Sequence, residues 1–588
     1  MDFTPLIPEN APFTPAQRQW LNGYLAGLLA GETRASGAAT PDSGRAPIPL
    51  LILFGSQTGT AEQLARRVAT EARARGCEPR VMEAAAHGSI DWTRETNLLV
   101  VTSTYGDGEM PDNARDFWLW LQGDAARPLD RLGFSVLALG DSNYPEFCAA
   151  GRNIDERLGA LGARRIHPRA DCDVDYEAAA KGWIDSVLAA LTPPNAAGPK
   201  PSPTGGPGGA ASPPSTGFGK ARPFPARLLA NRRLNGEGSE KETRHFEISL
   251  EGSSLSYEAG DALGVVPSNC PALVEEIIAL LGGDGEEGVP MPGGGETSLR
   301  RALATACDIT RPGGELLQRL GAHHPEVRTL LSPDRKEELR RWLWGHEIID
   351  LLLGAPGAGL KPAEFVGLLK KLAPRLYSIS SSPKAHAGEV HLTVNVVRHP
   401  SHGRSRKGVC STFLADRVGP ATEVPVFVQA SHGFRLPASG ETPVIMVGPG
   451  TGVAPFRAFL HERRATGATG RNWLFFGEQR SAHDFYYREE LEGMRAEGHL
   501  TRLDTAFSRD QAAKVYVQHR IAERADELWS WLQEGAHFYV CGDASRMARD
   551  VDAALHAVAA TAGGLGPEGA AEYIAGLKTA KRYQRDVY

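Results

Sequence analysis

The sequence lacks any hydrophobic run long enough to cross a membrane and any cysteine pair at metal-ligand spacing. Its 588 residues contain no stretch of about 18 apolar residues, and the N-terminus, Met1–Asp2–Phe3, has no basic segment of the kind that opens a secretion signal. The seven cysteines stand singly, which argues against zinc, an iron–sulfur cluster of the chain's own and a disulfide framework. We therefore expect a cytoplasmic protein that binds no metal and no membrane.

An excess of positive charge is also missing. The chain has 64 Lys and Arg against 70 Asp and Glu, a net charge of −6, which argues against a nucleic-acid binder. What the chain does have is length and glycine. A chain of 588 residues exceeds what one hydrophobic core supports, so several domains are expected. The 66 glycines and 41% hydrophobic residues suit loop-rich α/β domains.

Residues 1–49 are predicted to form a short helix and a loose segment. Thr14–Pro15 is a helix start, and apolar residues follow at helical spacing, namely Trp20, Leu21, Tyr24, Leu25 and Leu28. Such a helix either packs on its own domain or serves assembly.

The next stretch reads as strand, polar loop and helix. Leu50–Phe54 is apolar, Gly55–Thr60 is rich in glycine and hydroxyls, and helical spacing begins at Ala61. Backbone N–H groups and hydroxyls at a helix start suit a phosphate. The loop has no lysine of the kind that nucleoside triphosphate loops carry, so a singly phosphorylated ligand such as FMN fits better. The alternative is a plain turn.

Two later strand ends support the FMN prediction. The strands Leu98–Ser103 and Phe134–Leu139 lead into Gly-rich acidic loops that carry Tyr105 and Tyr144. Doubly wound sheets bind ligands where parallel strands end, and two rings can enclose an isoalloxazine. Residues 50–191 therefore form a predicted flavodoxin-like domain. Its candidate FMN residues are Ser56, Gln57, Thr58, Gly59, Thr60, Ala61, Ser103, Thr104, Tyr105, Gly106, Leu139, Gly140, Asp141, Ser142, Asn143, Tyr144, Phe147 and Cys148.

The same loops are acidic. They carry Asp107, Glu109, Asp112, Asp116, Asp141 and Glu146 beside Arg115. Such a cluster is either a solvated face or, beside an exposed flavin edge, a docking surface for a basic electron acceptor.

A linker rich in Pro and Gly covers residues 192–220, and a strand-rich region follows at 221–440. The strands are predicted at His245–Leu250, His391–Val397 and Val424–Val428, and an insert at about 271–372 is predicted to be helical. Arg375–Ser378 is the key segment, because Arg375 and Tyr377 share one strand face and suit a pyrophosphate and a ring. Gly408–Thr412 is expected to open a helix whose N–H groups face the same pyrophosphate.

The last 150 residues or so alternate strand and helix, which predicts a parallel sheet over residues 441–588. Gly448–Pro455 is a glycine turn that permits close approach of a dinucleotide pyrophosphate. Ser508–Arg509 and Lys514–Gln518 supply hydroxyls and cations suited to a 2′-phosphate, which favours NADPH. The alternative for these residues is a solvated basic loop.

The Arg375–Ser378 segment resembles the FAD-binding signature of the ferredoxin-NADP reductase superfamily, Tyr257–Val265 resembles a strand of that family, and Gly448–Pro455 is similar to its nucleotide turn. From Leu50 to Tyr588 the chain resembles the diflavin reductases, most of all the flavoprotein α-components of NADPH-sulfite reductases. The resemblance implies a multidomain α/β fold: a flavodoxin-like doubly wound domain, an FAD β-barrel with a helical insert, and a parallel α/β NADPH domain. It also implies electron flow from NADPH to FAD to FMN.

The resemblance implies particular site residues and partners. Ser378, Cys541 and Asp586 would surround the reacting atoms, and Tyr588 would stack on the flavin and act as a gate. The electron acceptor would be a subunit with sirohaem and an iron–sulfur cluster, and the flavoprotein would self-associate through its N-terminal region within a hetero-oligomer. The implied FAD contacts are Arg375, Leu376, Tyr377, Ser378, Thr393, Val394, Asn395, His399, Gly408, Val409, Cys410, Ser411 and Tyr588. The implied NADPH contacts are Gly450, Thr451, Ser508, Arg509, Lys514, Val515, Tyr516, Val517, Gln518 and Asp550.

Two other functions stay open on sequence alone. An NADPH–cytochrome P450 reductase, or another haemoprotein reductase, would share Tyr105, but it would be expected to carry a membrane anchor and a tryptophan before its last residue. A non-catalytic flavin-bearing docking protein would be expected to have lost the hydride site, whereas Ser378, Cys541, Asp586 and Tyr588 are all present.

Overall fold

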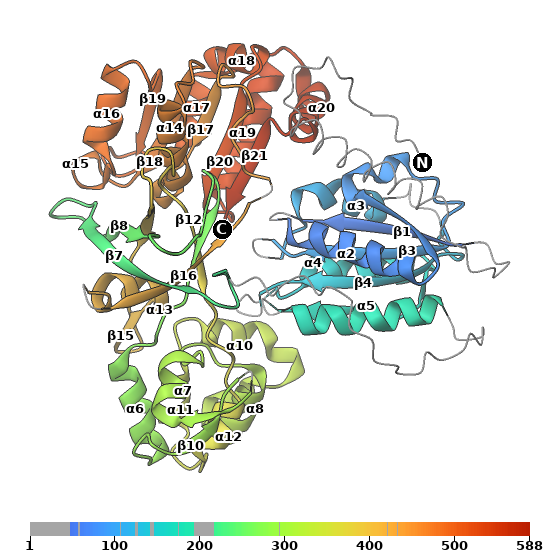
Figure 1. Cartoon of the computed structure of the whole chain (residues 1–588), viewed down its shortest axis with the longest axis vertical. Helices are drawn as coiled ribbons and strands as arrows, with labels where there is room; N and C mark the ends of the chain where they lie inside the picture. Colours follow the sequence, from blue (N-terminus) through green and yellow to red (C-terminus); the bar gives the residue numbers. More distant parts are fainter. Residues whose placement is uncertain are drawn as a thin grey trace, which may run out of the picture.

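The computed structural model describes residues 47–56, 59–105, 108–123, 128–141, 146–173, 176–192, 217–292, 294–419, 422–431 and 433–588. The predicted N-terminal helix, most of the predicted linker, Asp107 and the candidate FMN residues Gln57, Thr58, Gly106, Ser142, Asn143 and Tyr144 lie outside them. Figure 1 shows the first domain on one side of a tall second body, which consists of a nucleotide-type α/β domain, a central set of strands and a helical subdomain. No helix in the described part of the chain is both long and apolar enough to cross a membrane.

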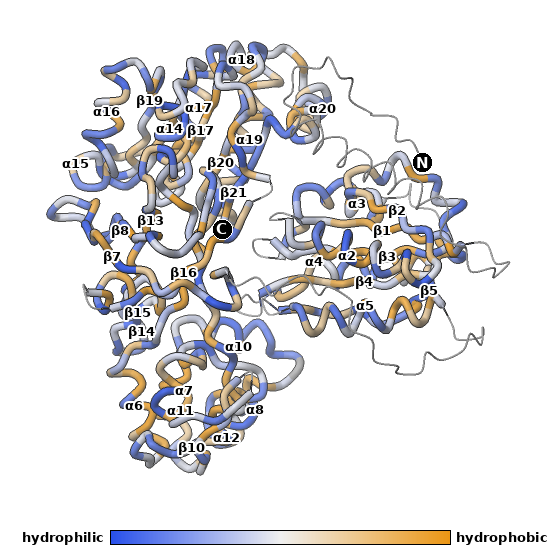
Figure 2. Tube along the Cα trace, in the orientation of Figure 1, coloured by the Kyte–Doolittle hydropathy of each residue, from blue (hydrophilic) through white to orange (hydrophobic). Residues whose placement is uncertain are grey.

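The first domain is a parallel sheet with the order β2-β1-β3-β4-β5, and β6 pairs with β4 beyond the end of β5. The central strands β1, β3 and β4 are almost continuously apolar because helices cover both faces. Every residue of β4 is buried, and Figure 2 shows the hydrophobic colour along the central strands. The elements are β1 (Ile48–Gly55), α2 (Thr60–Ala74), β2 (Cys77–Glu83), η1 (Ala84–Ser89), β3 (Asn97–Ser103), α3 (Asp112–Gln122), β4 (Gly133–Leu139), α4 (Ala149–Ala160), β5 (Arg164–Arg165), β6 (Ala170–Cys172) and α5 (Glu177–Leu191).

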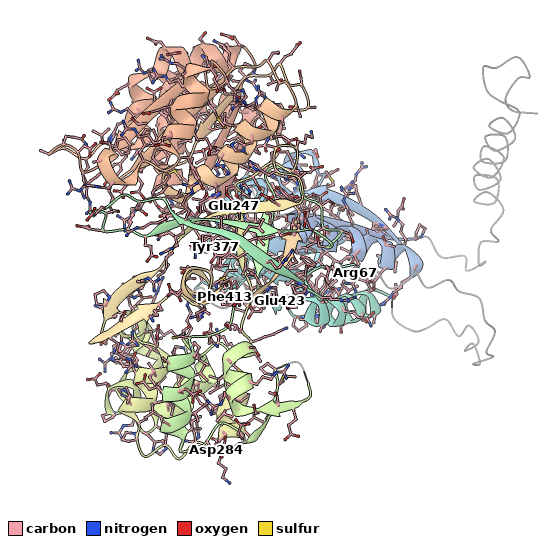
Figure 3. The ribbon with its side chains drawn as sticks, turned by 60° about the vertical axis from the view of Figure 1, so that its left-hand side comes forward. Arg67, Glu247, Asp284, Tyr377, Phe413 and Glu423 are labelled. Atoms are coloured by element: carbon pink, nitrogen blue, oxygen red, sulfur yellow. The ribbon has the colours of Figure 1, made fainter. Side chains whose placement is uncertain are left out.

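The central strands form an antiparallel sheet with the order β12-β9-β16-β7-β8-β13. A bridge between Ile379 and Leu392 joins its two edges, so the sheet curls towards a barrel. The elements are β7 (Phe224–Arg233), β8 (Thr243–Ser249), β9 (Ala262–Val265), β12 (Arg375–Ser378), β13 (Glu389–Asn395), the hairpin of β14 (Arg398–Ser401) and β15 (Arg404–Lys407), α13 (Val409–Thr412), η3 (Phe413–Arg417) and β16 (Glu423–Gln429). Figure 3 labels Tyr377 and Phe413 within this region.

The predicted strand over Tyr257–Val265 is wrong in its first half. The strand β9 begins only at Ala262, because the residues before it form a turn. The Asp261 N–H donates to the Glu258 carbonyl, and the Glu258 N–H donates to the Asp261 carboxylate. Gly260 takes a φ of 101° there, which an L side chain rarely adopts.

The insert between β9 and β12 is helical, as predicted, and has its own apolar core. Its elements are α6 (Pro271–Leu281), the hairpin of β10 (Gly288–Pro290) and β11 (Glu296–Ser298), α7 (Leu299–Thr305), α8 (Gly314–Gly321), α9 (Pro325–Leu330), η2 (Pro333–Arg335), α10 (Lys336–Leu343), α11 (Ile348–Gly354) and α12 (Pro362–Gly367).

The last domain is a parallel sheet with the order β19-β18-β17-β20-β21. The chain ends inside this sheet, because β21 pairs with β20 almost to the last residue. The elements are β17 (Val444–Val447), η4 (Gly450–Val453), α14 (Ala454–Ala465), β18 (Asn472–Glu478), α15 (Ser481–Asp484), α16 (Arg488–Ala496), β19 (Arg502–Phe507), α17 (Val517–Glu523), α18 (Ala525–Gln533), β20 (His537–Gly542), α19 (Met547–Thr561), α20 (Gly566–Thr579) and β21 (Tyr583–Val587). The predicted fold class is therefore confirmed.

Candidate functional site

A serine, a cysteine and an aspartate meet where the barrel touches the last domain. Cys541 on β20 lies opposite Asp586 on β21 in the strand register. The Ser378 hydroxyl, at the end of β12, donates to Asp586 Oδ2 at 2.7 Å, and the Cys541 thiol donates to the same oxygen at 3.9 Å. Burial raises the pKa of the Asp586 carboxyl and also that of the Cys541 thiol. Three side chains that are far apart in sequence thus form one polar cluster.

The terminal Tyr588 covers the same place. Its backbone N–H donates to the Gly542 carbonyl at 3.0 Å, and its hydroxyl lies 2.8 Å from Thr451 Oγ1 in the glycine turn. The residue is 59% exposed, and these two hydrogen bonds hold its backbone and its hydroxyl in place. Beneath it, a Cβ on Gly452 would lie 2.1 Å from the Cys541 carbonyl oxygen, so only glycine lets the turn approach β20.

Tyr105 reaches this cluster from the first domain. Its hydroxyl donates to the Val587 carbonyl at 2.6 Å and accepts the Val587 N–H at 3.0 Å. The ring packs against the core of the last domain. A residue predicted to enclose a flavin therefore contacts the strand that carries Asp586 in this arrangement.

The predicted phosphate loop of the first domain is described at its two ends, on either side of Gln57 and Thr58. The Ser56 hydroxyl accepts the Ala61 N–H at 3.2 Å, and Gly59 takes a φ of 87° just before α2. The Thr104 hydroxyl accepts the Ala150 N–H at the second strand end. Among the described residues, Ser103 Oγ is buried without a hydrogen-bond partner, which suits a site that a polar ligand completes.

The other candidate FMN residues of the described chain lie at the third strand end. Leu139 is buried, Gly140 and Asp141 are half-buried, and Cys148 is fully buried. Burial raises the pKa of the Cys148 thiol to about 12, and a Cβ on Gly140 would lie 2.8 Å from the Cys148 backbone nitrogen. The Cys148 side chain is therefore structural, and the backbone at Gly140 has no room for a side chain.

The candidate FAD residues fall into two groups. Tyr377 contacts the Cys410 thiol, and Arg375 lies near that thiol, so the strand and the helix start at Gly408 face each other as predicted. The second group, Thr393 and the residues after it, does not form one surface. The Thr393 hydroxyl lies 2.6 Å from the Tyr487 hydroxyl of the last domain, and Val394 is buried in the barrel, whereas Asn395 and His399 are exposed.

The candidate NADPH residues surround the carboxyl ends of β17, β18 and β19. Gly450 takes a φ of 59° in the glycine turn, and Tyr516 is 42% exposed. The Gln518 side chain donates to Asp550 at 2.9 Å. Arg509 donates to Glu240, a residue of the barrel. Open glycine backbone, an exposed ring and nearby cations fit a phosphorylated dinucleotide.

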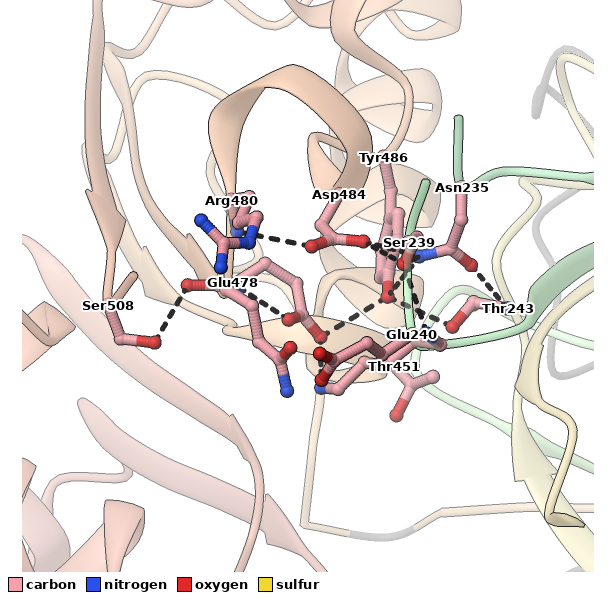
Figure 4. Close-up of polar contacts among 12 residues, drawn as sticks. Asn235, Ser239, Glu240, Thr243, Thr451, Glu478, Arg480, Asp484, Tyr486 and Ser508 are labelled. Atoms are coloured by element: carbon pink, nitrogen blue, oxygen red, sulfur yellow. Dashed lines mark hydrogen bonds and ion pairs between the residues drawn. The ribbon is translucent and has the colours of Figure 1, made fainter. Parts of the chain in front are cut away.

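A polar network that the sequence does not predict joins the turn between β7 and β8 to the last domain (Figure 4). The buried Asp484 accepts from Asn235 and Ser239, and the Lys241 ammonium pairs with Glu478. The sequence Gly236–Lys241, rich in glycine and charge between two strands, indicates a hairpin turn. Nothing in it indicates the partner across the domain boundary.

Comparison with known proteins gives the class. The chain matches the Flavodoxin family over residues 52–183, the FAD binding domain over 216–413 and the Oxidoreductase NAD-binding domain over 446–553. With the fold and the cluster at Asp586, these matches define a diflavin reductase, an NADPH-dependent oxidoreductase that takes FMN, FAD and NADPH.

Full-length relatives give the particular family. The chain is 44% identical over 584 residues to the sulfite reductase (NADPH) flavoprotein alpha-component of Bacillus subtilis (strain 168), covering 98% of this chain and 96% of the relative. It is 44% identical to the protein of that name from Neisseria meningitidis serogroup B (97% and 95% covered) and 42% identical to that of Shewanella sp. strain ANA-3 (98% and 96%). The chain therefore belongs to the family of sulfite reductase (NADPH) flavoprotein alpha-components. The alternative haemoprotein reductase is not favoured.

Proposed function

We propose that the chain passes electrons from NADPH through FAD and FMN to a separate haemoprotein subunit, which carries sirohaem and an iron–sulfur cluster and reduces sulfite to sulfide. When bound, NADPH supplies a hydride, FAD accepts it and FMN passes the electrons outward one at a time. The observation that supports this most is the cluster of Ser378, Cys541 and Asp586 between the flavin barrel and the nucleotide sheet. The proposed cofactor domains are residues 50–191 for FMN, 221–440 for FAD and 441–588 for NADPH.

Each residue of the cluster has a proposed task. Ser378 and Cys541 orient the nicotinamide against the flavin. Both side chains donate to the same oxygen of Asp586, which fixes their positions. Asp586 in its ionised form stabilises the positive charge that develops on the nicotinamide. Because burial raises its pKa, we expect flavin reduction to accelerate as the pH rises through that pKa. Tyr588 covers the site and must move aside, which its exposure permits.

The proposal extends to the acceptor and to assembly. The acidic residues Glu109 and Asp112 dock a basic surface of the haemoprotein. The N-terminal segment mediates self-association of the flavoprotein within the hetero-oligomer. The location is the cytoplasm; all seven cysteines are free thiols, as expected in a reducing compartment.

The experiment is anaerobic titration of the purified chain with NADPH, with released flavins quantified and sulfite added with and without a sirohaem subunit. We expect one FAD and one FMN per chain, both bleached, and sulfide only in the reconstituted mixture. Bleaching without sulfide but with ready reduction of cytochrome c would favour a different haem acceptor. Failure of FAD to bleach would refute the proposal.

A variant pair tests the cluster itself. Asp586→Asn should slow FAD bleaching by roughly 100-fold and flatten its pH dependence, since a charge that acts in the transition state is lost. Asp543→Asn, in the loop after β20, is the matched control and should change the rate little. Equal rates for the two variants would refute the role of Asp586.

A further inference from the structure

The turn between β7 and β8 extends from the flavin barrel onto the nucleotide domain, where three contacts hold it. Asp484 is 1% exposed and accepts hydrogen bonds from Asn235 Nδ2 at 2.8 Å and Ser239 Oγ at 2.5 Å. The Gly236 N–H donates to the His483 carbonyl at 2.7 Å. Figure 4 shows this turn facing the end of β18. The backbone of the turn is therefore fixed relative to the nucleotide domain.

Two charged residues at the end of this turn have opposite environments. Lys241 pairs with Glu478, whose side chain is only 3% exposed, so the charge of this lysine is compensated by a buried carboxylate. Glu240 points outward. Its carboxylate lies 2.6 Å from Arg509 Nη1, and the two side chains are 72% and 41% exposed. Ser508, the neighbour of Arg509, is drawn beside Glu478 in Figure 4.

We propose that Glu240 is a selectivity residue of the nucleotide site. Its carboxylate binds the guanidinium of Arg509, which the 2′-phosphate of NADPH would otherwise bind. The inference rests on the proposed role of Arg509 in NADPH binding. A carboxylate and a phosphate both bind a guanidinium through two acceptor oxygens, so the two ligands compete for one partner. The flavin barrel thereby contributes a residue to nucleotide selection.

The consequence differs between nucleotides. NADPH must exchange the carboxylate for its phosphate, whereas NADH has no 2′-phosphate and leaves the pair of Glu240 and Arg509 intact. Because Asp484 fixes the turn, the displaced carboxylate stays near the bound phosphate and repels it. The exposed pair is weak, so the penalty on NADPH is roughly two- to fivefold in affinity.

The test uses the full-length protein and calorimetric titration with 2′,5′-ADP and with 5′-AMP. Glu240→Gln should tighten 2′,5′-ADP binding roughly two- to fivefold, leave 5′-AMP unchanged and lose most of this gain at about 0.5 M salt. The matched control is Glu237→Gln, which removes the same charge from an exposed residue of the same turn. It should shift the 2′,5′-ADP affinity by less than about half as much.

A third variant separates the two proposals. Arg509→Gln should weaken 2′,5′-ADP binding at least tenfold in either background and reduce the effect of Glu240→Gln to what direct repulsion by the carboxylate contributes. If Arg509→Gln weakens binding but Glu240→Gln does not tighten it, the role of Glu240 is wrong and the proposed NADPH site stands. If Arg509→Gln has no effect, the assignment of the 2′-phosphate site fails and the inference fails with it.

Discussion

The nucleotide domain contacts the flavin barrel and the first domain in two different ways. Against the barrel, charged and polar side chains are buried: Arg457 is 6% exposed and donates to the Ser380 carbonyl of the barrel, and Asp484 is 1% exposed and accepts from Asn235 and Ser239. Against the first domain, the pair of Arg549 and Glu109 has side chains that are 61% and 40% exposed. The contacts of the described residues on that side also include the hydrogen bonds of Tyr105 and the pair of Arg585 and Asp112, whose side chains are 11% and 26% exposed.

The difference indicates which contact opens more easily. Separating the buried Asp484 from Asn235 and Ser239 would leave a charge without its hydrogen bonds in a low dielectric, whereas an exposed pair such as Arg549 with Glu109 exchanges partners with water at little cost. The proposed electron route would need such an asymmetry, because the first domain would have to face two partners in turn.

The largest expected effect comes from the buried side. Arg457→Met should destabilise the chain by about 2–4 kcal/mol, because the Ser380 carbonyl and the Glu490 carboxylate both lose the buried guanidinium that donates to them. Denaturant unfolding, with FAD release followed in parallel, measures this. The control is Arg488→Met, which breaks an exposed pair with Glu492 and should cost no more than about 0.5 kcal/mol. Similar losses for the two variants would contradict the comparison.

Acid should loosen the same buried contact. Burial lowers the pKa of His391 to about 3 and that of His245 to about 2. Arg457, Glu389 and His386 also face His391. A histidine whose folded pKa lies below its unfolded value contributes stability that is fully present above the unfolded pKa and is lost as the pH falls towards the folded one.

Stability should therefore decline from about pH 6.5 towards pH 3, by on the order of a few kcal/mol. His391→Gln should flatten part of that decline when unfolding is measured across the range. His323→Gln, at an exposed position in the helical insert, should leave it unchanged. A curve for His391→Gln that is parallel to the wild type would show that the histidine is not responsible.

Local sequence pattern was enough to predict most strands and the loops that follow them. Apolar runs such as Asn472–Phe476 specify β18 because neighbouring residues alone decide whether a segment can be buried on both faces. The strand expected at Tyr257–Asp261 is replaced by a turn, in which the Asp261 carboxylate accepts the Glu258 N–H. A turn of this kind depends on one contact and leaves the apolar pattern unchanged.

The candidate site was predictable only in part for a related reason. The glycine turn and the segment Arg375–Ser378 carry their chemistry within a few residues. The meeting of Ser378 with Asp586 was expected from family resemblance, since no local pattern relates residues separated by 208 positions. Glu240 and Tyr105 find partners across domain boundaries, and those partners depend on how finished domains dock.

Tyr105→Phe should have a smaller effect in free energy than the changes at Arg457 and His391. The change removes the hydroxyl that bonds both the carbonyl and the N–H of Val587, so it should weaken the closed arrangement by about 1 kcal/mol. Small-angle scattering should then show a larger extended fraction, by roughly fivefold. Tyr573→Phe removes a hydroxyl bond to Gln533 within the nucleotide domain and should leave the scattering curve unchanged. An unchanged curve for Tyr105→Phe would mean that other contacts hold the first domain.

The smallest effect should come from the pair of Arg549 and Glu109. Both side chains are more exposed than a third, so the pair contributes about 0.2–1 kcal/mol at low salt and less when salt screens it. A double-mutant cycle of Arg549→Gln and Glu109→Gln isolates the coupling free energy of the pair. It is measured by scattering at low salt and at about 0.5 M salt. A coupling that vanishes in salt would show that the pair opens easily. Glu109 must be able to leave Arg549 if it is also to bind the proposed basic acceptor. A large coupling that does not depend on salt would make both sides of the nucleotide domain fixed, and the first domain could not leave.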